Sequence, residues 1–427
     1  MLIDFSVKNY GPFRDKTRLS LQRTSADEHP ENLIDCPAIG EEALCSAAIF
    51  GPNSSGKSYI LRAVSVLIDM VRMPRIPNMK ITQYQPFRLS SKTVKEPVEM
   101  EIRFVTDGVL YHYSLSFDSN KVVSESLYHY PNGRRSKVFD REGSEFTFTK
   151  VMKNQKEISE KTAPNSTYIS VAAQFNNEIC LKAHRGMVED IIFIAGEAKG
   201  LFTRVAQMIN DSPDAKRLMI RAMKIADFGI SDVISNVEKK DISELEHDIP
   251  SQLLDYVKSI LAKKVTSVDL ALKHDFNDSD ADEKDLYFPI GIESNGTMQM
   301  LCIMGPIIDS LQNGKTIIID EFGLYLHSDI SHWIISQFKS NQNPKGAQII
   351  VSTHDQMLMD TAELFRRDQI FFTRKNPSDG SSELYSLSDF KGVRKDTDAR
   401  KGYSIGRYEA LPFISPEDLI GWESKEP

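Results

Sequence analysis

The sequence predicts an α/β protein that combines a mixed β-sheet around a glycine-rich loop with an antiparallel β subdomain and a helical insertion. Three observations lead to this prediction. The short apolar run CSAAIF (45–50) enters the glycine-rich stretch GPNSSGKS (51–58), and apolar residues then recur at helical spacing. Five runs between residues 97 and 149 alternate as strands do, and turn residues separate most of them. From about 185 to 265 the periodicity is mostly helical.

The composition is that of an ordinary globular protein. The chain has 427 residues, of which 41% are hydrophobic and 26% are charged, and its net charge of −8 argues against a surface that is basic throughout. The N-terminus lacks a signal-peptide pattern and no window approaches 18 consecutive apolar residues, so we expect a cytoplasmic protein with no membrane partner. The cysteines have no CxxC spacing, which favours reduced, buried thiols at Cys36, Cys45, Cys180 and Cys302.

Taken in order, the expected elements divide the chain into five regions. Strands at the N-terminus and the glycine-rich loop with its helix form a first lobe, and a β subdomain and a mainly helical insertion follow. A C-terminal lobe contains a helix and two apolar strands, and two shorter strands, QIFFT and ELYSLSD, lie close to the C-terminal tail. The expected boundaries of these five regions are 1–90, 91–150, 151–285, 286–375 and 376–427.

The glycine-rich stretch has the spacing of a phosphate-binding loop, because Gly51, Gly56, Lys57 and Ser58 match G-x-x-x-x-G-K-[ST]. Glycines let successive backbone N–H groups point at a phosphate chain, and the N-terminus of the next helix adds a favourable dipole. We expect the lysine to reach the β- and γ-phosphates and the serine to bind Mg²⁺. The apolar strand before the loop and the helix after it provide the context that this motif needs.

A buried strand that ends in two carboxylates comes later in the chain. The run TIII (316–319) is apolar, and Asp320 and Glu321 follow at its carboxyl end, where open α/β sheets bind ligands. Buried carboxylates are costly unless a metal ion, water or a cation compensates their charge. We expect Asp320 to hold Mg²⁺ through water, and Glu321 to orient and deprotonate the attacking water.

A second apolar strand, IIV (349–351), runs into Ser352, Thr353 and His354. A lone histidine is usually structural. This one follows an apolar strand downstream of the carboxylates, which places it within reach of a γ-phosphate bound at the loop. We therefore favour a functional role for His354.

The stretch ESNGTMQML (293–301) opens a helix shortly before Asp320. The hydroxyl of Ser294 and the open amides beside Gly296 would form a second anion site. No N-K-x-D run that could read guanine is present, which favours ATP over GTP. The acidic run 274–285 lacks the glycine and the final glutamate of an EF-hand, so we expect a solvated loop there rather than a calcium site.

In this order, the phosphate loop, the helix-start serine, the Asp-Glu strand and the strand-end histidine resemble the ABC-type ATPase heads of the SMC and OLD group. The resemblance is closest to the stand-alone RloA and AbiLi-type AAA family ATPases of prokaryotic phage defence. The long coiled-coil arms of SMC proteins and the nuclease domain of OLD proteins are not expected. The resemblance rests on MLIDFSVKNYGPFRD (1–15), DEFGLYLHSDI (320–330), and LFRRDQIFFT, ELYSLSDFKGVRKD and IGRYEALPF between 364 and 413.

The resemblance implies an ABC-ATPase head that uses ATP and Mg²⁺. Catalysis would fall to Glu321, His354 and Lys57, with His354 sensing the γ-phosphate. The metal would be held by Ser58 and Asp320, and either Gln83 or Gln85 would be the glutamine linked to it, with Gln85 placed in the expected metal set. The expected nucleotide contacts are Gly51, Pro52, Asn53, Ser54, Ser55, Gly56, Lys57, Ser58 and Tyr59, with Ser294 and Gly296 acting across a dimer.

The same resemblance implies an ATP-driven sensor or switch in phage defence. A homodimer or higher oligomer would close on ATP, and a separate effector, a nuclease or a toxin, would read the state. The alternative is a DNA-repair or chromosome-maintenance ATPase that acts directly on DNA. Between residues 360 and 410, ten Lys or Arg stand against nine Asp or Glu, which is poor support for a phosphate-binding surface. A scaffold that binds ATP without turnover would not need a base at Glu321.

Overall fold

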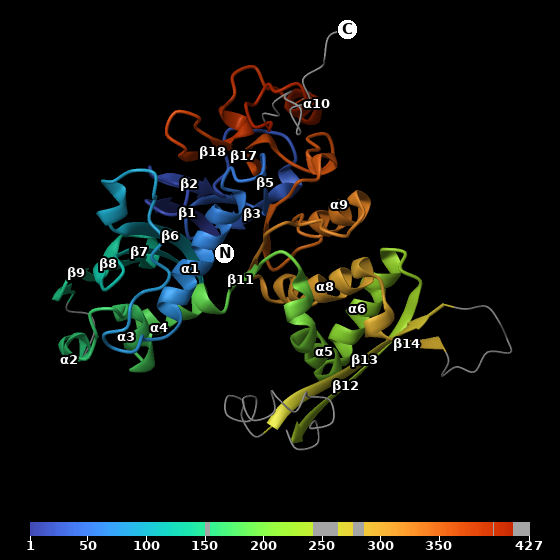
Figure 1. Ribbon diagram of the computed structural model, residues 1–427, viewed down its shortest axis with the longest axis horizontal. Helices are drawn as coiled ribbons and strands as arrows, with labels where there is room; N and C mark the ends of the chain where they lie inside the picture. The colour runs from blue at the N-terminus through green and yellow to red at the C-terminus, as the bar shows by residue number, and fades with distance from the viewer. Residues whose placement is uncertain (150–153, 242–263, 276–285, 396, 413–427) are drawn as a thin grey trace, which may run out of the picture.

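The protein is described here by a computed structural model that covers residues 1–149, 154–241, 264–275, 286–395 and 397–412. An antiparallel sheet lies at one side of the molecule, a mixed sheet lies beside it, and a lobe of helices with a small sheet extends from the other side (Figure 1). The expected α/β class, with a mixed sheet and an antiparallel β subdomain, is confirmed.

The mixed sheet positions the candidate site. Its strand order is β11-β15-β16-β5-β17-β18, in which the first five strands run parallel and β18 is antiparallel to β17. Ile317 and Ile319 pack into one core while Ile318 packs into the other, as expected for strands that are buried on both faces. The strands are β11 (Ile191–Ile194), β15 (Thr316–Ile319), β16 (Gln348–Ser352), β5 (Ser46–Phe50), β17 (Ile370–Lys375) and β18 (Ser382–Ser386).

The antiparallel sheet has the order β10-β9-β8-β7-β6-β1-β2. Its strands alternate between buried and less buried residues, most regularly in β6, which confirms the prediction for residues 97–149. A separate two-stranded sheet pairs β3 (Leu33–Cys36) with β4 (Glu41–Leu44). The seven strands are β1 (Leu2–Lys8), β2 (Thr17–Ser20), β6 (Val98–Thr106), β7 (Val109–Phe117), β8 (Val122–Tyr130), β9 (Ser136–Glu142) and β10 (Glu145–Phe148).

The helix after the glycine-rich loop, α1 (Lys57–Arg72), lies in the core that the two sheets share. Its apolar side chains recur every three or four residues and are buried, which confirms the predicted helix. Burying each such aliphatic side chain stabilises the fold by about 1.5–3 kcal/mol. The same core is covered by α2 (Gln155–Glu160), α3 (Tyr168–Gln174) and α4 (Glu178–Val188).

The opposite face of the mixed sheet is covered by a second core that includes the helices α5 (Phe202–Asp211), α6 (Pro213–Ile225), α8 (Asn295–Asn313) and α9 (Ser328–Ser336). The chain continues past the last strands to the short helix α10 (Ala399–Ser404). In Figure 1, α5 and α6 lie against the small sheet of the protruding lobe, and α8 lies against these two helices.

The insertion between 151 and 285 was expected to be mainly helical, and for part of it that prediction is wrong. Residues in β11, β12 (Ile230–Asp241) and β13 (Lys264–His274) form strands, and β13 also pairs with β14 (Tyr287–Pro289). The run ISDVISNV (230–237) has its apolar residues at the i, i+3, i+4 and i+7 spacing of a helix, so its periodicity is misleading, whereas its β-branched residues favour the strand that forms. The expected helix SQLLDYVKSILAK (251–263) and most of the acidic run lie outside the described residues.

One buried side chain joins the two large sheets. Gln348 at the start of β16 accepts hydrogen bonds from the Leu2 N–H at 2.6 Å and from the Thr316 hydroxyl at 2.9 Å. Its amide donates to the carbonyl oxygens of Leu2 and Leu44, at 3.0 Å each. The amide therefore ties β1 of the antiparallel sheet to β15 and β16 of the mixed sheet.

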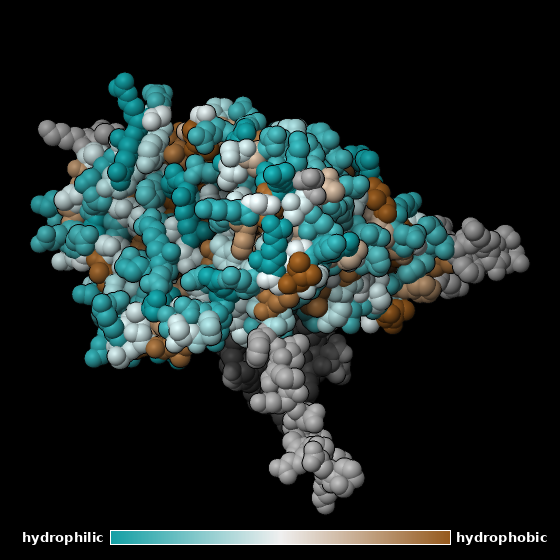
Figure 2. Space-filling model, turned by 90° about the horizontal axis from the view of Figure 1, so that it is seen from above, coloured by the Kyte–Doolittle hydropathy of each residue, from teal (hydrophilic) through white to brown (hydrophobic). Residues whose placement is uncertain are grey.

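The outer surface is mainly polar. On the face seen in Figure 2, hydrophobic side chains lie in small separate groups between hydrophilic ones. Among the helices that the structure describes, none is long and apolar enough to cross a membrane.

Candidate functional site

The glycine-rich loop follows β5 and needs glycine at both of its ends. Gly51 has φ = 147°, and a Cβ there would lie 2.5 Å from Thr373 Oγ1. Gly56, at φ = 112°, precedes the first residue of α1, and a Cβ there would lie 2.9 Å from the ring of Phe13. Both positions combine a backbone angle that favours glycine with a close neighbour, so the two glycines of the motif are required by the local geometry.

Lys57 is the first residue of α1, and its side chain is buried beneath the loop. Its Nζ donates to the carbonyl oxygens of Gly51 and Pro52, at 2.8 and 2.9 Å. Burial lowers the pKa of this ammonium group to about 8, and the charges of Asp320 and Glu321 offset part of that fall. Lys57 is thus close enough to both carboxylates to interact with them.

The carboxyl end of β15 carries Asp320 and Glu321, as predicted. Asp320 is buried, and its Oδ1 accepts a hydrogen bond from the Ser352 hydroxyl at 2.5 Å. The same hydroxyl oxygen accepts the backbone N–H of Glu321 at 2.9 Å. Ser352 ends β16, so a side chain from the neighbouring strand fixes both acidic residues.

Glu321 itself is exposed and has φ = 53°, a backbone conformation that costs energy for a residue with a side chain. Its carboxylate lies beside the loop after β11, where Oε2 is 3.7 Å from the position of a Cβ at Gly196. The next turn is held by the Tyr325 hydroxyl, which donates to Glu197 Oε1 at 2.9 Å. The turn after β15 therefore directs the Glu321 side chain out of the sheet, toward the strand ends.

His354 follows β16, the strand that lies between β15 and β5 in the sheet. The pKa of its imidazole is lowered by partial burial and next by the positive charge of Lys57, while Glu321 and Asp320 act in the opposite direction. Thr353, just before it, donates its hydroxyl hydrogen bond to the Phe322 carbonyl at 2.9 Å. The structure thus brings together the loop, both carboxylates and the histidine at the ends of three adjacent parallel strands.

As expected, Ser294 caps α8 and Gly296 lies in its first turn, but neither belongs to the group of side chains at the ends of β15, β16 and β5. The Ser294 hydroxyl caps the helix by accepting the Thr297 N–H at 3.1 Å. A Cβ at Gly296 would lie 3.0 Å from the Tyr325 carbonyl oxygen. Among the described residues, no hydrogen bond or ion pair joins either residue to the glycine-rich loop. Farther along α8, Gln299 accepts the Ala198 N–H at 3.0 Å and so links the helix to the loop after β11.

Two hollows flank the glycine-rich loop. One, of about 470 Å³, is lined by Gly51, Pro52, Asn53 and His354 among others. The other, of about 490 Å³, is lined by Tyr59 and Gln85 and by further residues from the N-terminal turn. The remaining expected contacts, Ser54, Ser55 and Ser58, lie in the loop or the first turn of α1.

The two alternative glutamines lie in one segment, in which Gln83 is half-buried and Gln85 is exposed. The carbonyl oxygen of Gln85 accepts the Gly11 N–H at 2.8 Å, and Gln83 Oε1 accepts the Thr82 hydroxyl at 3.1 Å. Neither glutamine contacts Asp320 through a hydrogen bond in the described part of the chain. The choice between Gln83 and Gln85 as a metal-linked residue stays a prediction.

Sequence reasoning gave no role to two hydroxyls that shape the site. Thr373, near the end of β17, lies 2.5 Å from Ser55 Oγ through its own Oγ1, so it supports the glycine-rich loop from the neighbouring strand. Ser352 supports the carboxylates in the same way. Both residues lie toward the carboxyl ends of strands that flank β5. That position at the ligand-binding edge of the sheet is the signal from which a role for them could have been predicted.

The residues at the strand ends fit a hard divalent cation. Asp320 uses Oδ1 for Ser352, and within the described chain its Oδ2 has no hydrogen-bond partner. Ser58 offers a hydroxyl from the first turn of α1. Carboxylate and hydroxyl oxygens are the ligands that Mg²⁺ prefers, usually together with water and substrate phosphates.

Comparison with solved structures gives distant likenesses. The SMC head domain from Thermotoga maritima is 13% identical, with 90% of this chain and 98% of that chain covered and a TM-score of 0.40. The Smc head domain bound to the C-terminal domain of ScpA, from Pyrococcus furiosus, is 13% identical over 96% of this chain and 99% of that chain, with a TM-score of 0.40. The recombination mediator protein RecF of the RecFOR pathway is 12% identical over 90% of this chain and 98% of that chain, with a TM-score of 0.38.

No curated protein matches the chain. A family profile described as "AAA domain, putative AbiEii toxin, Type IV TA system" matches residues 46–360, which include the glycine-rich loop, the two carboxylates and His354. This match confirms the part of the expectation that placed the chain among AAA family proteins. Because the matched segment is well over half of its length, the chain belongs to this family of AAA-domain proteins.

Proposed function

We propose that this protein binds ATP with Mg²⁺, hydrolyses it, and acts as an ATP-driven switch in antiviral (phage) defence together with a separate effector. One observation supports this most strongly. The glycine-rich loop, the Asp320–Glu321 pair and His354 follow three adjacent parallel strands, and Lys57 lies within electrostatic reach of both carboxylates. Phosphate, metal and attacking water would meet there.

Each residue then has a distinct task. Lys57 would leave the loop carbonyls and neutralise charge on the β- and γ-phosphates. Glu321 would take a proton from the water that attacks the γ-phosphate, and the neutral His354 would donate a hydrogen bond to that phosphate. Ser58 and Asp320 would hold Mg²⁺, which when bound would supply positive charge for the phosphate oxygens.

The second half of the site would come from another copy of the chain. Ser294 and Gly296 make no polar contact with their own glycine-rich loop, and Ser294 opens a helix of 19 residues. The start of such a helix suits an anion such as a γ-phosphate. A two-fold dimer would place each α8 start against the partner's loop and bury two ATP molecules between the chains.

Release of phosphate from ATP, with and without Mg²⁺, tests the catalytic part of the proposal. Lys57→Ala should lose ATP binding in calorimetry. Glu321→Gln should keep ATP bound while its turnover falls about 10²–10⁴-fold, the usual contribution of a general base. Lys16→Ala, which removes an exposed lysine just before β2, is the matched control and should behave as wild type. Wild-type turnover in Glu321→Gln would remove Glu321 from the mechanism.

The biological part is tested by plating phage on cells that carry the chain with its neighbouring genes. Protection that disappears in Glu321→Gln cells, and that needs a second gene, supports the switch with a separate effector. ATP turnover that rises on addition of DNA, with no need of a second protein, would instead support a DNA-maintenance ATPase.

A further inference from the structure

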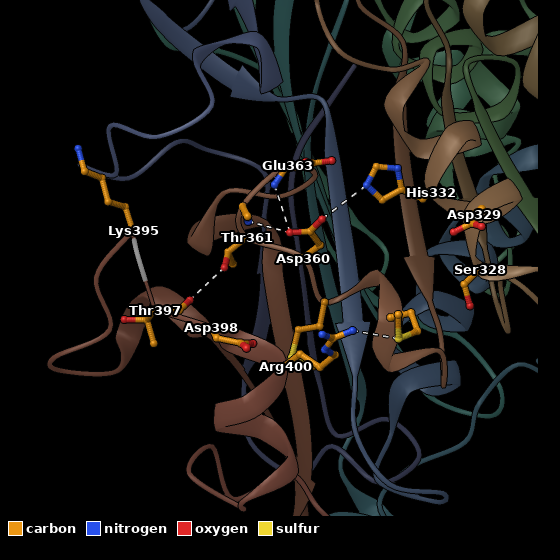
Figure 3. A pocket seen from close by; sticks show the side chains of 13 residues that line it. Ser328, Asp329, His332, Asp360, Thr361, Glu363, Lys395, Thr397, Asp398 and Arg400 are labelled. Atoms are coloured by element: carbon orange, nitrogen blue, oxygen red, sulfur yellow. Dashed lines mark hydrogen bonds and ion pairs between the residues drawn. The ribbon is translucent and has the colours of Figure 1, made fainter.

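Outside the candidate ATP site, three side chains with metal-binding atoms converge on one cavity. The cavity has a volume of about 610 Å³ and lies beside α9. His332 of α9 faces Asp360 and Glu363, which follow the segment after His354, and Figure 3 shows the three side chains directed toward one another. One ligand atom from each lies within 4.8 Å of the others.

The carboxylate of Asp360 is held in place by its own turn. Its Oδ1 accepts the N–H groups of Ala362 and Glu363, at 2.8 and 3.1 Å. This leaves Oδ2 to face the imidazole, 3.7 Å from His332 Nε2. The turn is also fixed from outside, because the Thr361 hydroxyl donates to the Thr397 carbonyl at 3.1 Å. One of the ligand atoms is therefore positioned before any ion binds.

The charges around the cluster favour a cation. In the described part of the chain, no lysine or arginine forms an ion pair with Asp360 or Glu363, and His332 is the one ion-pair partner of Asp360. Lys339 approaches Glu363 but donates to its backbone carbonyl, at 2.7 Å. Lys395 and Arg400 also line the cavity, but so do Asp329 and Asp398, so four carboxylates stand against two basic side chains and leave negative charge at the cavity wall.

The spacing suits a first-row divalent cation. Two atoms bound to one tetrahedral Zn²⁺ at about 2.1 Å lie about 3.4 Å apart. The ligand atoms of the cluster lie within 4.8 Å of one another, so the farthest pair has to close by up to about 1.4 Å, and rotation of the exposed Glu363 side chain can supply this movement. An imidazole nitrogen beside carboxylates suits zinc better than Mg²⁺, which prefers a shell of oxygens.

We propose that His332, Asp360 and Glu363 form a binding site for a divalent cation of the zinc class. The site joins two segments that each leave the candidate ATP site. The helix α9 begins just after the turn that follows Glu321, and Asp360 comes soon after His354. The bound cation would cross-link these two segments. The proposal does not depend on ATP binding.

The test is a Zn²⁺ titration of the metal-stripped chain without nucleotide, read by competition with a metallochromic chelator and by thermal unfolding. Wild type should bind one equivalent at micromolar concentration and unfold at a higher temperature. His332→Gln and Glu363→Gln should each weaken binding at least about tenfold, since even outer-shell changes at metal sites cost about 10–100-fold. Asp360 is left unchanged because it also supports the turn.

His184→Gln and Glu178→Gln, both on the remote helix α4, are matched controls and should bind Zn²⁺ as wild type does. An excess of Mg²⁺ should not displace the bound zinc. The site is refuted if wild type shows no saturable binding below about 100 µM Zn²⁺. It is equally refuted if both cluster variants fold normally and bind zinc with unchanged affinity.

Discussion

The hydroxyl of Ser352 donates a hydrogen bond to Asp320 Oδ1 over 2.5 Å, in a buried position at the ends of two neighbouring strands. The same oxygen accepts the backbone N–H of Glu321, so one side chain fixes the proposed metal ligand and the proposed base together. Because its hydroxyl bonds both acidic residues, we expect Ser352 to act as a positioning residue.

Ser352→Ala should therefore slow ATP turnover while leaving ATP affinity nearly unchanged. Leaving a buried polar group without its partner costs about 1–3 kcal/mol. If that cost falls on the geometry of the acidic pair, kcat drops about tenfold, because about 1.4 kcal/mol corresponds to a factor of ten. Steady-state kinetics measures the change in kcat, and calorimetry measures the affinity for ATP. Ser352→Thr keeps the hydroxyl and should recover most of the rate, and Ser336→Ala on α9 is the control. An unchanged kcat in Ser352→Ala would contradict the positioning role.

The affinity for ATP should fall as the pH rises above about 8, the pKa to which burial lowers Lys57 in the free protein. Phosphates would raise that pKa in the complex, so binding above pH 8 must take up a proton. Each further pH unit then weakens binding by up to about tenfold, while below pH 8 Lys57 is charged in both states and contributes no pH dependence. Asp320, Glu321 and His354 face the ammonium group, and the pKa of His354 is lowered by partial burial and by the charge of Lys57.

Calorimetry in buffers of different ionisation enthalpy, at pH values below and above 8, measures this proton uptake. Lys57→Ala should bind weakly at every pH and show no uptake. Proton uptake of the same size in Lys57→Ala would assign the effect to another group.

Mixed dimers should reveal whether the site is shared between chains. Lys57→Ala chains and Ser294→Arg chains should each be inactive alone. A mixed dimer has one site with both lesions and one site with neither, so part of the ATPase activity should return on mixing. Activity is measured across mixing ratios, with mixed dimers counted by native mass spectrometry. Mixed dimers as inactive as the parents, together with Glu321→Gln chains that stay monomeric in saturating ATP, would overturn the shared site.

A buried ion pair in the antiparallel sheet should matter for stability. Glu125 on β8 and Arg141 on β9 are both almost fully buried, with 3.5 Å between their charged groups. Glu125 also accepts the Tyr168 N–H at 2.6 Å, at the start of α3. Arg141→Met leaves this carboxylate without its counter-charge and should lower the free energy of unfolding by about 3–5 kcal/mol. Chemical denaturation measures the change, with the exposed Arg134→Met as control, and a loss below about 0.5 kcal/mol would contradict the pairing.

Much of the mixed sheet could be predicted because its strands carry strong local signals. An apolar run that stops at Gly51, and another that stops at Asp320, each indicate a buried strand ending at a ligand site. The adjacency of β15, β16 and β5 was expected only through the resemblance to known ATPase heads, since local patterns do not determine strand order.

The rest depends on contacts between distant segments. Thr373 and Ser55 meet across two parallel strands, and no local pattern at either position predicts that hydrogen bond. His332 reaches Asp360 and Glu363 only after the chain has passed through β16. The strand β12 was missed because its apolar residues recur at the helical spacing i, i+3, i+4 and i+7, and the helical interpretation was then extended over β13.

The four side-chain hydrogen bonds of Gln348 also restrict how the two large sheets can move relative to each other. Sliding the antiparallel sheet along the mixed sheet would leave the buried side-chain amide of Gln348 without its hydrogen-bond partners. This costs about 1–3 kcal/mol for each polar group left unpaired. The strand end that carries Gln348 is opposite to the end that carries Ser352 and His354. Sliding of one large sheet along the other is therefore disfavoured, and we expect the two sheets to move together.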